Sequence, residues 1–499
     1  MALNSYKASI YNFIFNSINA IVVIANGIIM VPIYFHYMSV STYGAWLASG
    51  NVVALLGLLE SGLSFVITQK LAASLSSEDE TGFRTLAGSN ILSSVFITLL
   101  ILIFGLILAP FITGWINVEP AVQKEITIAF IISVIASCLS ITVSLLGAFP
   151  QVWQETKQVG VYNTISSLIA IGSIVLFLWC GFGVISIALS YLIRSLLNLI
   201  LYSSWIWRKW KEKEYGRVLF SLNDTFLLTK ACFYPFLSKV SSTLVLNSQG
   251  LLIAHFITPA ATAVFDITSK VCSVACGFAA NTNGSFFALL SLSFTDGDKN
   301  RSNNIIQNTS LFFFTLLFGI ALYSLCFSEA IVNYWVGIDK FGGKALLATI
   351  VISNVLYQIR AYLNNILYAG GFITLSAKRD ILWMLCYIIF LCFTINNLKI
   401  YAIPISTTIS CIVFIVVYSY MISKHLGIEM RPLCSVLLKS LFLICPLVLV
   451  HFYININYQC LRIYIYYFCI FTIIYLALLF AVNIKFLKQI KTRFINEKS

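Results

Sequence analysis

Long apolar runs alternate with short polar breaks along almost the whole chain. About 20 residues of helix cross the hydrocarbon of a bilayer, and fourteen of the runs are long enough to do so. They lie near residues 10–35, 43–68, 88–113, 122–147, 160–181, 183–206, 230–257, 261–292, 305–328, 344–371, 380–398, 401–422, 434–455 and 462–484. The first run continues beyond the length of a signal-peptide core and no A-x-A site follows it, so we expect a retained span. The pattern predicts an all-α membrane protein with about 14 transmembrane helices.

The longest polar break inside the chain, WRKWKEKEYGRVLFSLND at residues 207–224, follows the sixth run. It predicts an N-terminal six-helix lobe (1–206), a basic linker (207–229), a second six-helix lobe (230–422) and a further helix pair with a basic tail (423–499). The segment NGIIMVPIYFHY resembles QGLLIAHFITPA, and LLGAFPQVWQETK resembles ILYAGGFITLSAK. These similarities favour two lobes related by a parallel pseudo-two-fold axis along the membrane normal.

Composition agrees with this pattern, because 60% of the residues are hydrophobic and only 10% are charged. A water-soluble fold could not cover so apolar a core, so the chain is an integral membrane protein. The 13 cysteines show no CxxC pair and no metal-ligand spacing, and most lie inside apolar runs as small hydrophobic residues. No metal and no cofactor is expected.

The net charge of +13 is distributed unevenly between the two sides predicted from the runs. With the N-terminus inside, 22 Lys and Arg residues lie on the inner side and 5 on the outer side. The positive-inside rule then places both termini in the cytoplasm. This explains the basic total better than nucleic-acid binding does.

Six ionised side chains fall inside the predicted spans, and they are the first candidates for function. An isolated charge at membrane depth costs at least a few kcal/mol, so each needs a partner, a proton or water. The cations outnumber the acids by four to two: Arg194, Lys239, Lys270 and Arg360 against Glu60 and Asp266. A surplus of cations around a cavity suits an anionic cargo, and the Arg fork matches phosphate oxygens.

Spacing adds detail to these candidates. Asp266 and Lys270 are four residues apart and can pair on one helical face. Arg194 and Arg360 each precede an asparagine by one helical turn, whereas Lys239 lies near a membrane end, where a lysine can snorkel. For any one of these residues the alternative is a buried structural salt bridge.

Four asparagines in the first span form a second candidate group. Their spacing of four, three and seven residues puts Asn12, Asn16, Asn19 and Asn26 on one helical stripe. Amides facing lipid would leave donors and acceptors unpaired, so the stripe faces another helix or water. The stripe either forms hydrogen bonds between helices or makes one wall of a hydrophilic vestibule.

Catalytic signatures are missing from the sequence. There is no GxSxG, HExxH or P-loop, and the four histidines are far apart in sequence. The predicted outer loops are short, whereas an enzyme acting on lipid-linked sugars needs a sizeable external loop. We therefore expect no enzyme activity.

The stretch VPIYFHYMSVSTYGAWLASGNVVALLGLLESGLSFVITQKLA, residues 31–72, resembles the polysaccharide flippases. These are the O-antigen or Wzx type of the multidrug/oligosaccharidyl-lipid/polysaccharide exporter superfamily. The shared features are Pro32 near the end of span 1, the YGxW motif at 43–46 and the GLxxxGLS stretch at 57–64. The six-plus-six-plus-two layout agrees over essentially the full length.

The resemblance implies movement of undecaprenyl-diphosphate-linked repeat units for O-antigen and lipopolysaccharide biosynthesis, from the cytoplasmic to the periplasmic leaflet of a bacterial inner membrane. Alternating access between the lobes is implied, with a proton or sodium as coupling ion and a polysaccharide polymerase and a chain-length regulator as partners. On this hypothesis Arg194, Lys270, Arg360 and Lys239 attract the diphosphate. Glu60 and Asp266 balance those cations or bind the coupling ion, and the four asparagines bond sugar or water.

Two other functions stay open at this point. A multidrug or cation antiporter of the same superfamily would carry a cationic cargo, so its cavity should be rich in acids. A polymerase or non-transporting scaffold of the same pathway is disfavoured by the short loops.

Overall fold

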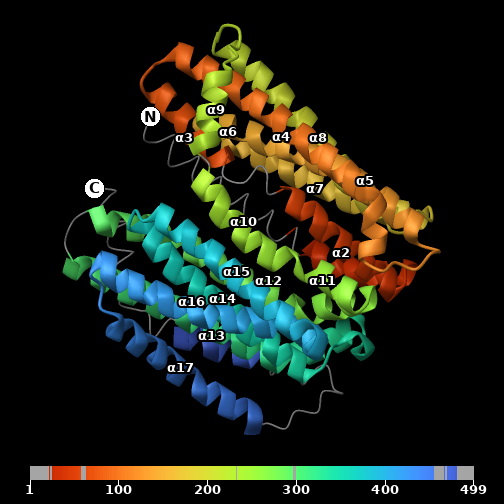
Figure 1. The fold of residues 1–499 in the computed structure, drawn as a ribbon, viewed down its shortest axis with the longest axis vertical. Coiled ribbons are helices and arrows are strands. Elements are labelled where there is room, and N and C mark those ends of the chain that lie inside the picture. The colour runs from red at the N-terminus through yellow and green to blue at the C-terminus, as the bar shows by residue number, and fades with distance from the viewer. Residues whose placement is uncertain are drawn as a thin grey trace. The chain divides into compact units, whose positions relative to one another are not determined.

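The computed structural model describes residues 22, 25–57, 63–231, 233–295, 299–453, 466 and 469–479, and it contains helices and no strand within them (Figure 1). The chain divides into two compact units, residues 1–263 (unit 1) and 264–499 (unit 2). Eight described segments are long and apolar enough to cross a membrane, and two shorter apolar helices accompany them. The predicted all-helical membrane fold is confirmed, and the number of 14 spans stays a prediction.

Unit 1 begins with a helical stretch at residues 25–37 and continues with helices α2 to α11. Their bounds are α2 Val40–Leu56, α3 Leu63–Ser76, α4 Glu80–Trp115, α5 Gln123–Leu146, α6 Ala148–Val152, α7 Thr156–Trp179, α8 Ile185–Glu212, α9 Leu222–Ala231, α10 Phe233–Asn247 and α11 Gln249–Phe256. Helix α5 packs against α4 and α8, and α8 packs against α7. These contacts make a bundle whose inner faces carry the polar residues described below.

Unit 2 contains most of α12 and everything after it. The bounds are α12 Pro259–Thr295, α13 Lys299–Val336, α14 Lys344–Ala369, α15 Ile373–Leu398, α16 Ala402–Leu426 and α17 Met430–Tyr453, with short 3₁₀ turns at Ile338–Lys340 and Lys399–Tyr401. Helices α14, α15 and α16 pack together, and α17 packs on α13. The helical residues 469–479 also join α13 through Phe471 and Tyr475. The division into a second lobe and a further helix pair stays a prediction.

Two of the differences between the helices and the predicted spans lie near the predicted linker. The predicted span 230–257 is divided into α10 and α11 at Asn247 and Ser248, two residues that favour caps and turns over helix interiors. Within the predicted linker 207–229, α8 continues to Glu212 and α9 begins at Leu222. The boundary between the compact units follows Ala263 instead of lying in that linker, because α10 and α11 pack on α2.

Helix α4 shows why these elements form where they do. Its N-cap Asp79 accepts a hydrogen bond from the Gly82 backbone at 2.9 Å, which satisfies one of the open N–H groups of the first turn. Its 36 residues are about 54 Å long at 1.5 Å per residue, more than the hydrocarbon thickness. The helix therefore extends out of the bilayer, and its polar first turns hold the segment that follows α8.

Candidate functional site

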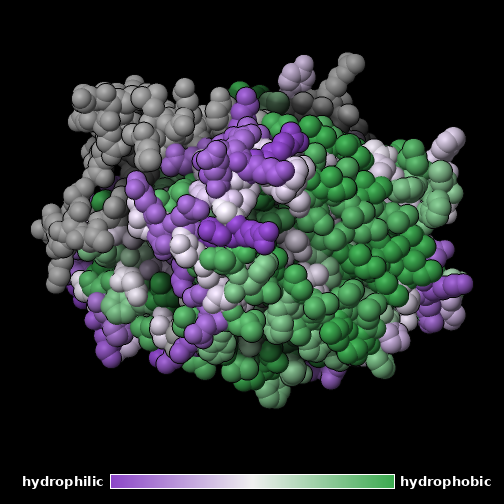
Figure 2. All heavy atoms as spheres, turned by 90° about the horizontal axis from the view of Figure 1, so that it is seen from above, coloured by the Kyte–Doolittle hydropathy of each residue, from purple (hydrophilic) through white to green (hydrophobic). Residues whose placement is uncertain are grey.

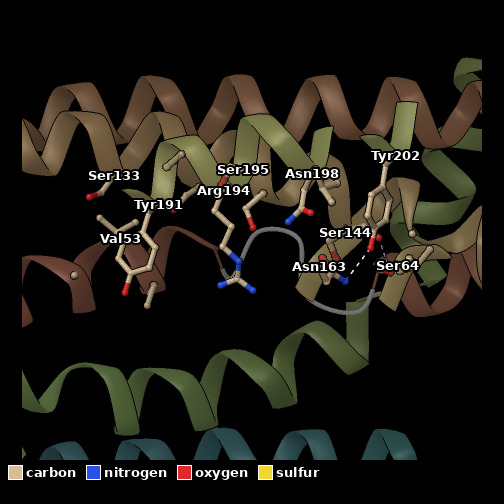
Figure 3. Close-up of a pocket in the computed structure, with 18 of the residues that line it drawn as sticks. Val53, Ser64, Ser133, Ser144, Asn163, Tyr191, Arg194, Ser195, Asn198 and Tyr202 are labelled. Carbon is tan, nitrogen blue, oxygen red and sulfur yellow. Dashed lines mark hydrogen bonds between the residues drawn. The ribbon is translucent and has the colours of Figure 1, made fainter. Parts of the chain in front are cut away.

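A cavity of about 790 Å³ lies inside unit 1, which is large enough for a ligand of several rings. Helices α2, α3, α5, α6, α7 and α8 contribute to its wall (Figure 3). Its polar lining consists of hydroxyls, amides and one guanidinium: Asn51, Ser64, Ser133, Ser137, Ser140, Ser144, Gln151, Asn163, Tyr191, Arg194, Ser195, Asn198 and Tyr202. Such a lining offers many hydrogen bonds to a polar ligand.

Helix α5 supplies one wall through a stripe of serines. Ser133, Ser137, Ser140 and Ser144 are four, three and four residues apart, so they point from one face of the helix. A serine occupies little volume, so this stripe leaves open space while keeping the wall polar. These serines were not among the residues predicted to be functional, although their spacing of four, three and four residues is visible in the sequence.

Helix α8 lines the cavity with larger polar side chains, those of Tyr191, Arg194, Asn198 and Tyr202. Asn198 Oδ1 accepts a hydrogen bond from Ser166 Oγ at 2.8 Å. The Tyr202 hydroxyl accepts one from Asn163 Nδ2 at 3.0 Å. These two bonds tie α8 to α7 on either side of a helical turn and fix the side chains of its cavity face.

Arg194 is the one charged residue among the described residues that line the cavity. Its guanidinium projects from α8 into the open space, between Tyr191 and Asn198 (Figure 3). No ion pair of Arg194 with an acid occurs among the described residues. A guanidinium in such a place attracts an anion, because the surrounding protein screens its charge less than bulk water does.

The YGxW motif has a structural explanation beside this cavity. Tyr43 is buried against the rings of Tyr34 and Phe35, with ring centroids 5.7 and 5.3 Å away. Gly44 faces the Pro259 carbonyl so closely that no Cβ would fit between them. Trp46 stacks on Tyr191 with centroids 6.3 Å apart. The motif thus packs α2 into unit 1 and supports the α8 turn that carries Arg194.

Asn26 is the member of the asparagine stripe that the structure describes. It lines a small cavity of about 20 Å³ together with Ser190 and Arg194. That volume holds a single water molecule. The buried Asn26 Oδ1 has no hydrogen-bond partner among the described residues, so a water placed there would have an acceptor to bond. Asn12, Asn16, Asn19 and Glu60 lie outside the described residues.

Arg360 lies in a different environment, inside unit 2. Its Nη1 is 2.7 Å from Asp380 Oδ1, and both residues are only 2% exposed. Asp380 also accepts hydrogen bonds from the Tyr418 hydroxyl at 2.8 Å and from Asn364 Nδ2 at 3.1 Å. The Arg360 guanidinium stacks on the Trp383 ring, 3.7 Å from its centroid. This cluster joins α14, α15 and α16 and leaves the charge of Arg360 compensated.

Asp380 corrects the count of intramembrane charges. Only two acids were expected inside the membrane, because Asp380 lay at the edge of a predicted span. Helix α15 in fact begins seven residues earlier, at Ile373. The carboxylate is consequently buried inside the helix bundle. One of the four cations, Arg360, therefore has a partner that the hydropathy pattern did not predict.

The remaining candidates are more exposed. Lys270 Nζ lies 3.3 Å from Asp266 Oδ2 on α12, which is the predicted pair at four-residue spacing. Lys239 on α10 is exposed. Arg194 and Lys239 belong to unit 1, while Asp266, Lys270 and Arg360 belong to unit 2. A single chamber shared by all these charges stays a prediction.

The chain was compared with known families, curated proteins and solved structures. The model of the family described as "Polysaccharide biosynthesis protein" matches residues 7–291. No curated protein matches the sequence. The structure titled lipid II flippase MurJ, inward closed conformation, is similar with a TM-score of 0.71 at 14% identity, covering 96% of this chain and 99% of that one.

Two transporters of the MATE family have similar structures. An inward-facing multidrug resistance MATE transporter of the MOP superfamily gives a TM-score of 0.63 at 14% identity, over 81% of this chain and 95% of that one. A MATE transporter of Vibrio cholerae gives 0.60 at 12% identity, over 85% and 99%. The family match confirms the resemblance to a polysaccharide family inferred from sequence, and the fold is one that flippases and transporters share. The chain therefore belongs to the polysaccharide biosynthesis protein family and has the fold of MOP-superfamily flippases and transporters.

Proposed function

We propose that this chain moves polyprenyl-diphosphate-linked oligosaccharides, such as O-antigen repeat units, from the cytoplasmic to the periplasmic leaflet of a bacterial inner membrane. The observation that carries the proposal is the polar cavity of unit 1, whose described lining contains one guanidinium and no carboxylate. A diphosphate would supply the negative counter-charge for Arg194, and sugar hydroxyls could form hydrogen bonds with the serines and amides. The similar structure named lipid II flippase gives a precedent for a lipid-linked cargo on this fold.

In this proposal Arg194 is the primary diphosphate contact, and Lys270 and Lys239 are secondary cations. Arg360 contributes to the same path only if cargo competes with Asp380, which already holds its guanidinium. The stripe of Asn12, Asn16, Asn19 and Asn26 bonds sugar or water. The polyprenyl tail stays in the surrounding lipid, so the cavity has to admit only the head group.

Coupling and assembly extend the proposal. Asp266, half-buried and paired with Lys270, is the described candidate for binding a proton or sodium, and Glu60 is the other. Both termini lie in the cytoplasm by the distribution of Lys and Arg. The transported unit would then pass to a polysaccharide polymerase and a chain-length regulator.

A multidrug or cation antiporter is the second candidate, and the similarity to MATE transporters favours it. Its cargo is cationic, so its binding cavity needs carboxylates. The described lining of the unit 1 cavity has none, which favours the anionic cargo.

Complementation tests the two candidates against each other. The chain is expressed in a flippase-null strain that makes a defined repeat unit, and surface polysaccharide and drug resistance are both measured. Restored polysaccharide without added drug resistance supports the proposal. Drug resistance alone supports the antiporter, and lipid-linked repeat units accumulating on the outer face would indicate a polymerase defect instead.

A further inference from the structure

The segment between α8 and α10, residues 213–231, is fixed to unit 1 by specific bonds; we call it the strap. Arg84 Nε on α4 donates to the Arg217 carbonyl at 2.8 Å, and the Leu219 N–H donates back to the Arg84 carbonyl at 3.3 Å. Trp210 Nε1 donates to the Gly216 carbonyl at 2.9 Å. The strap is thus a built part of unit 1 with a defined orientation.

Packing holds the strap at two further points. Tyr215 lies against the Phe83 and Trp210 rings, with centroids 5.0 and 4.9 Å away, and this burial raises the pKa of its hydroxyl. Gly88 of α4 meets the Leu219 carbonyl where a Cβ would not fit. These contacts place the strap beside the first turns of α4.

Helix α9 of the strap presents large apolar side chains outward. Leu222 and Phe226 are 80% and 68% exposed, and Lys230 follows on the same stripe, four residues further. Leu228, on the other side of the helix, is fully buried and anchors it. An outward face with two large apolar residues and a lysine is typical of helices that lie in a membrane interface.

The position of the strap agrees with such an interface. It contacts α4 at Arg84 and Gly88, and the exposed apolar residues of α4 begin directly after this contact with Ile91, Val95 and Phe96. Those side chains mark where α4 enters lipid. The strap therefore lies at the level where the hydrocarbon begins. On the face of the molecule shown in Figure 2, groups of hydrophilic residues border hydrophobic surface.

The charged side chains of the strap indicate which class of lipid it would bind. Exposed cations accompany the strap and the adjoining end of α8: Arg208, Lys211, Lys213, Arg217 and Lys230. None of them forms an ion pair with an acid among the described residues, whereas Lys209 is held by Glu155 and Glu212 at 3.2 and 2.8 Å. The acids on the strap are Glu214 and Asp224, and Glu80 of α4, which lies close enough to act on Tyr215, is 3.9 Å from Arg84. The five exposed cations therefore outnumber the two acids of the strap.

We propose that the strap is a binding surface for anionic phospholipids. Leu222 and Phe226 insert at the boundary between headgroups and acyl chains, and Lys213, Arg217 and Lys230 bind lipid phosphates. The surface is distinct from the transport cavity, so it stands independently of the cargo proposed above.

Hydrogen–deuterium exchange of the full-length protein tests this in nanodiscs of phosphatidylcholine with or without phosphatidylglycerol. The amides of 219–231 should exchange more slowly when phosphatidylglycerol is present. Each cation near an anionic surface favours docking about fivefold, so three favour it on the order of a hundredfold. The combined variant Lys213→Gln, Arg217→Gln, Lys230→Gln should lose this lipid dependence.

A matched control variant removes the same number of positive charges from positions outside the strap. Lys124→Gln, Lys344→Gln and Lys399→Gln together remove three exposed lysines at helix ends far from the strap in sequence, and the lipid dependence should persist. Peptides of α5 report on folding of every variant. Strap protection that is equal in both lipids, or equal in detergent without phospholipid, would overturn the proposal. So would loss of lipid dependence in the matched variant.

Discussion

The Arg360 guanidinium lies 2.7 Å from the Asp380 carboxylate, whereas Arg194, which also precedes an asparagine by one helical turn, faces an open cavity. The two arginines have the same local sequence context. In unit 2 Asn364 bonds Asp380 and Ser376, and in unit 1 Asn198 bonds Ser166. Similar local sequence thus supports a compensated structural pair in one unit and a charge available to a ligand in the other.

Arg194→Gln should abolish surface polysaccharide in the complementation assay while the protein stays in the membrane in normal amount. The physical reason is that the cavity loses its one described cation and with it the attraction for diphosphate. Arg194→Lys should retain part of the activity, because it keeps the charge but loses the two-point fork. Arg431→Gln, an exposed arginine at the start of α17, serves as the matched control. Undiminished polysaccharide in Arg194→Gln would exclude the proposed role.

Arg360→Gln should destabilise unit 2, because it leaves the Asp380 carboxylate buried without its counter-charge. Breaking a buried pair from one side typically costs about 3–5 kcal/mol. The measurement is the temperature at which half of the detergent-purified protein loses its monodisperse peak. The double variant Arg360→Met, Asp380→Leu should recover much of the loss. If Arg360→Gln melts like the parent chain yet fails in transport, Arg360 contacts cargo directly.

Gly44→Ala should reduce the amount of folded protein, because its Cβ would meet the Pro259 carbonyl. Overpacking of this kind costs about 1–3 kcal/mol. Gly172→Ala on α7 is the matched control, since no atom lies within 4 Å of its Cβ position and alanine favours the helix. Equal thermal stability of the two variants would show that α2 can move away from Pro259 at no cost.

Ser137→Leu and Ser140→Leu should reduce transport by filling the cavity, with a greater effect for larger repeat units. Ser137→Ala and Ser140→Ala should stay active, because they preserve the space and remove only one hydroxyl among many. The readout is the amount of surface polysaccharide in strains that make repeat units of different size. Identical activity of the leucine and alanine variants would indicate that the head group does not pass along the α5 stripe.

Asp266→Asn should weaken the dependence of transport on the coupling ion, since it removes the half-buried carboxylate on α12. Transport into inverted vesicles is measured with a proton or a sodium gradient imposed separately. Lys270→Gln distinguishes the roles: it should lower cargo affinity and leave the gradient dependence intact. Unaltered gradient dependence in Asp266→Asn would leave Glu60 as the coupling candidate.

Several site features were accessible from the sequence because they depend on local spacing. The four-residue separation of Asp266 and Lys270 was enough to predict their pairing, which the structure confirms. The isolated position of Arg194 in an apolar run was enough to mark it as a candidate, and the structure places it at a cavity. The serine stripe on α5 has an equally local pattern, but serines are common glue between membrane helices and did not stand out.

Other features depended on contacts that no local pattern contains. The partner of Arg360 is 20 residues away on the next helix, and Asp380 looked like a boundary residue because hydropathy falls around Lys378 and Arg379. The assignment of α10 and α11 to unit 1 likewise depends on their packing against α2.

The sequence by itself determined that this chain is a multi-pass helical membrane protein of a polysaccharide biosynthesis family. Hydropathy over about 20 residues and the YGxW region were sufficient, because membrane insertion responds to short stretches of chain. Only the tertiary structure decided which charges are neutralised and which face a cavity. A Coulomb interaction depends on distance and local dielectric, and both are set by helices that meet in the folded bundle.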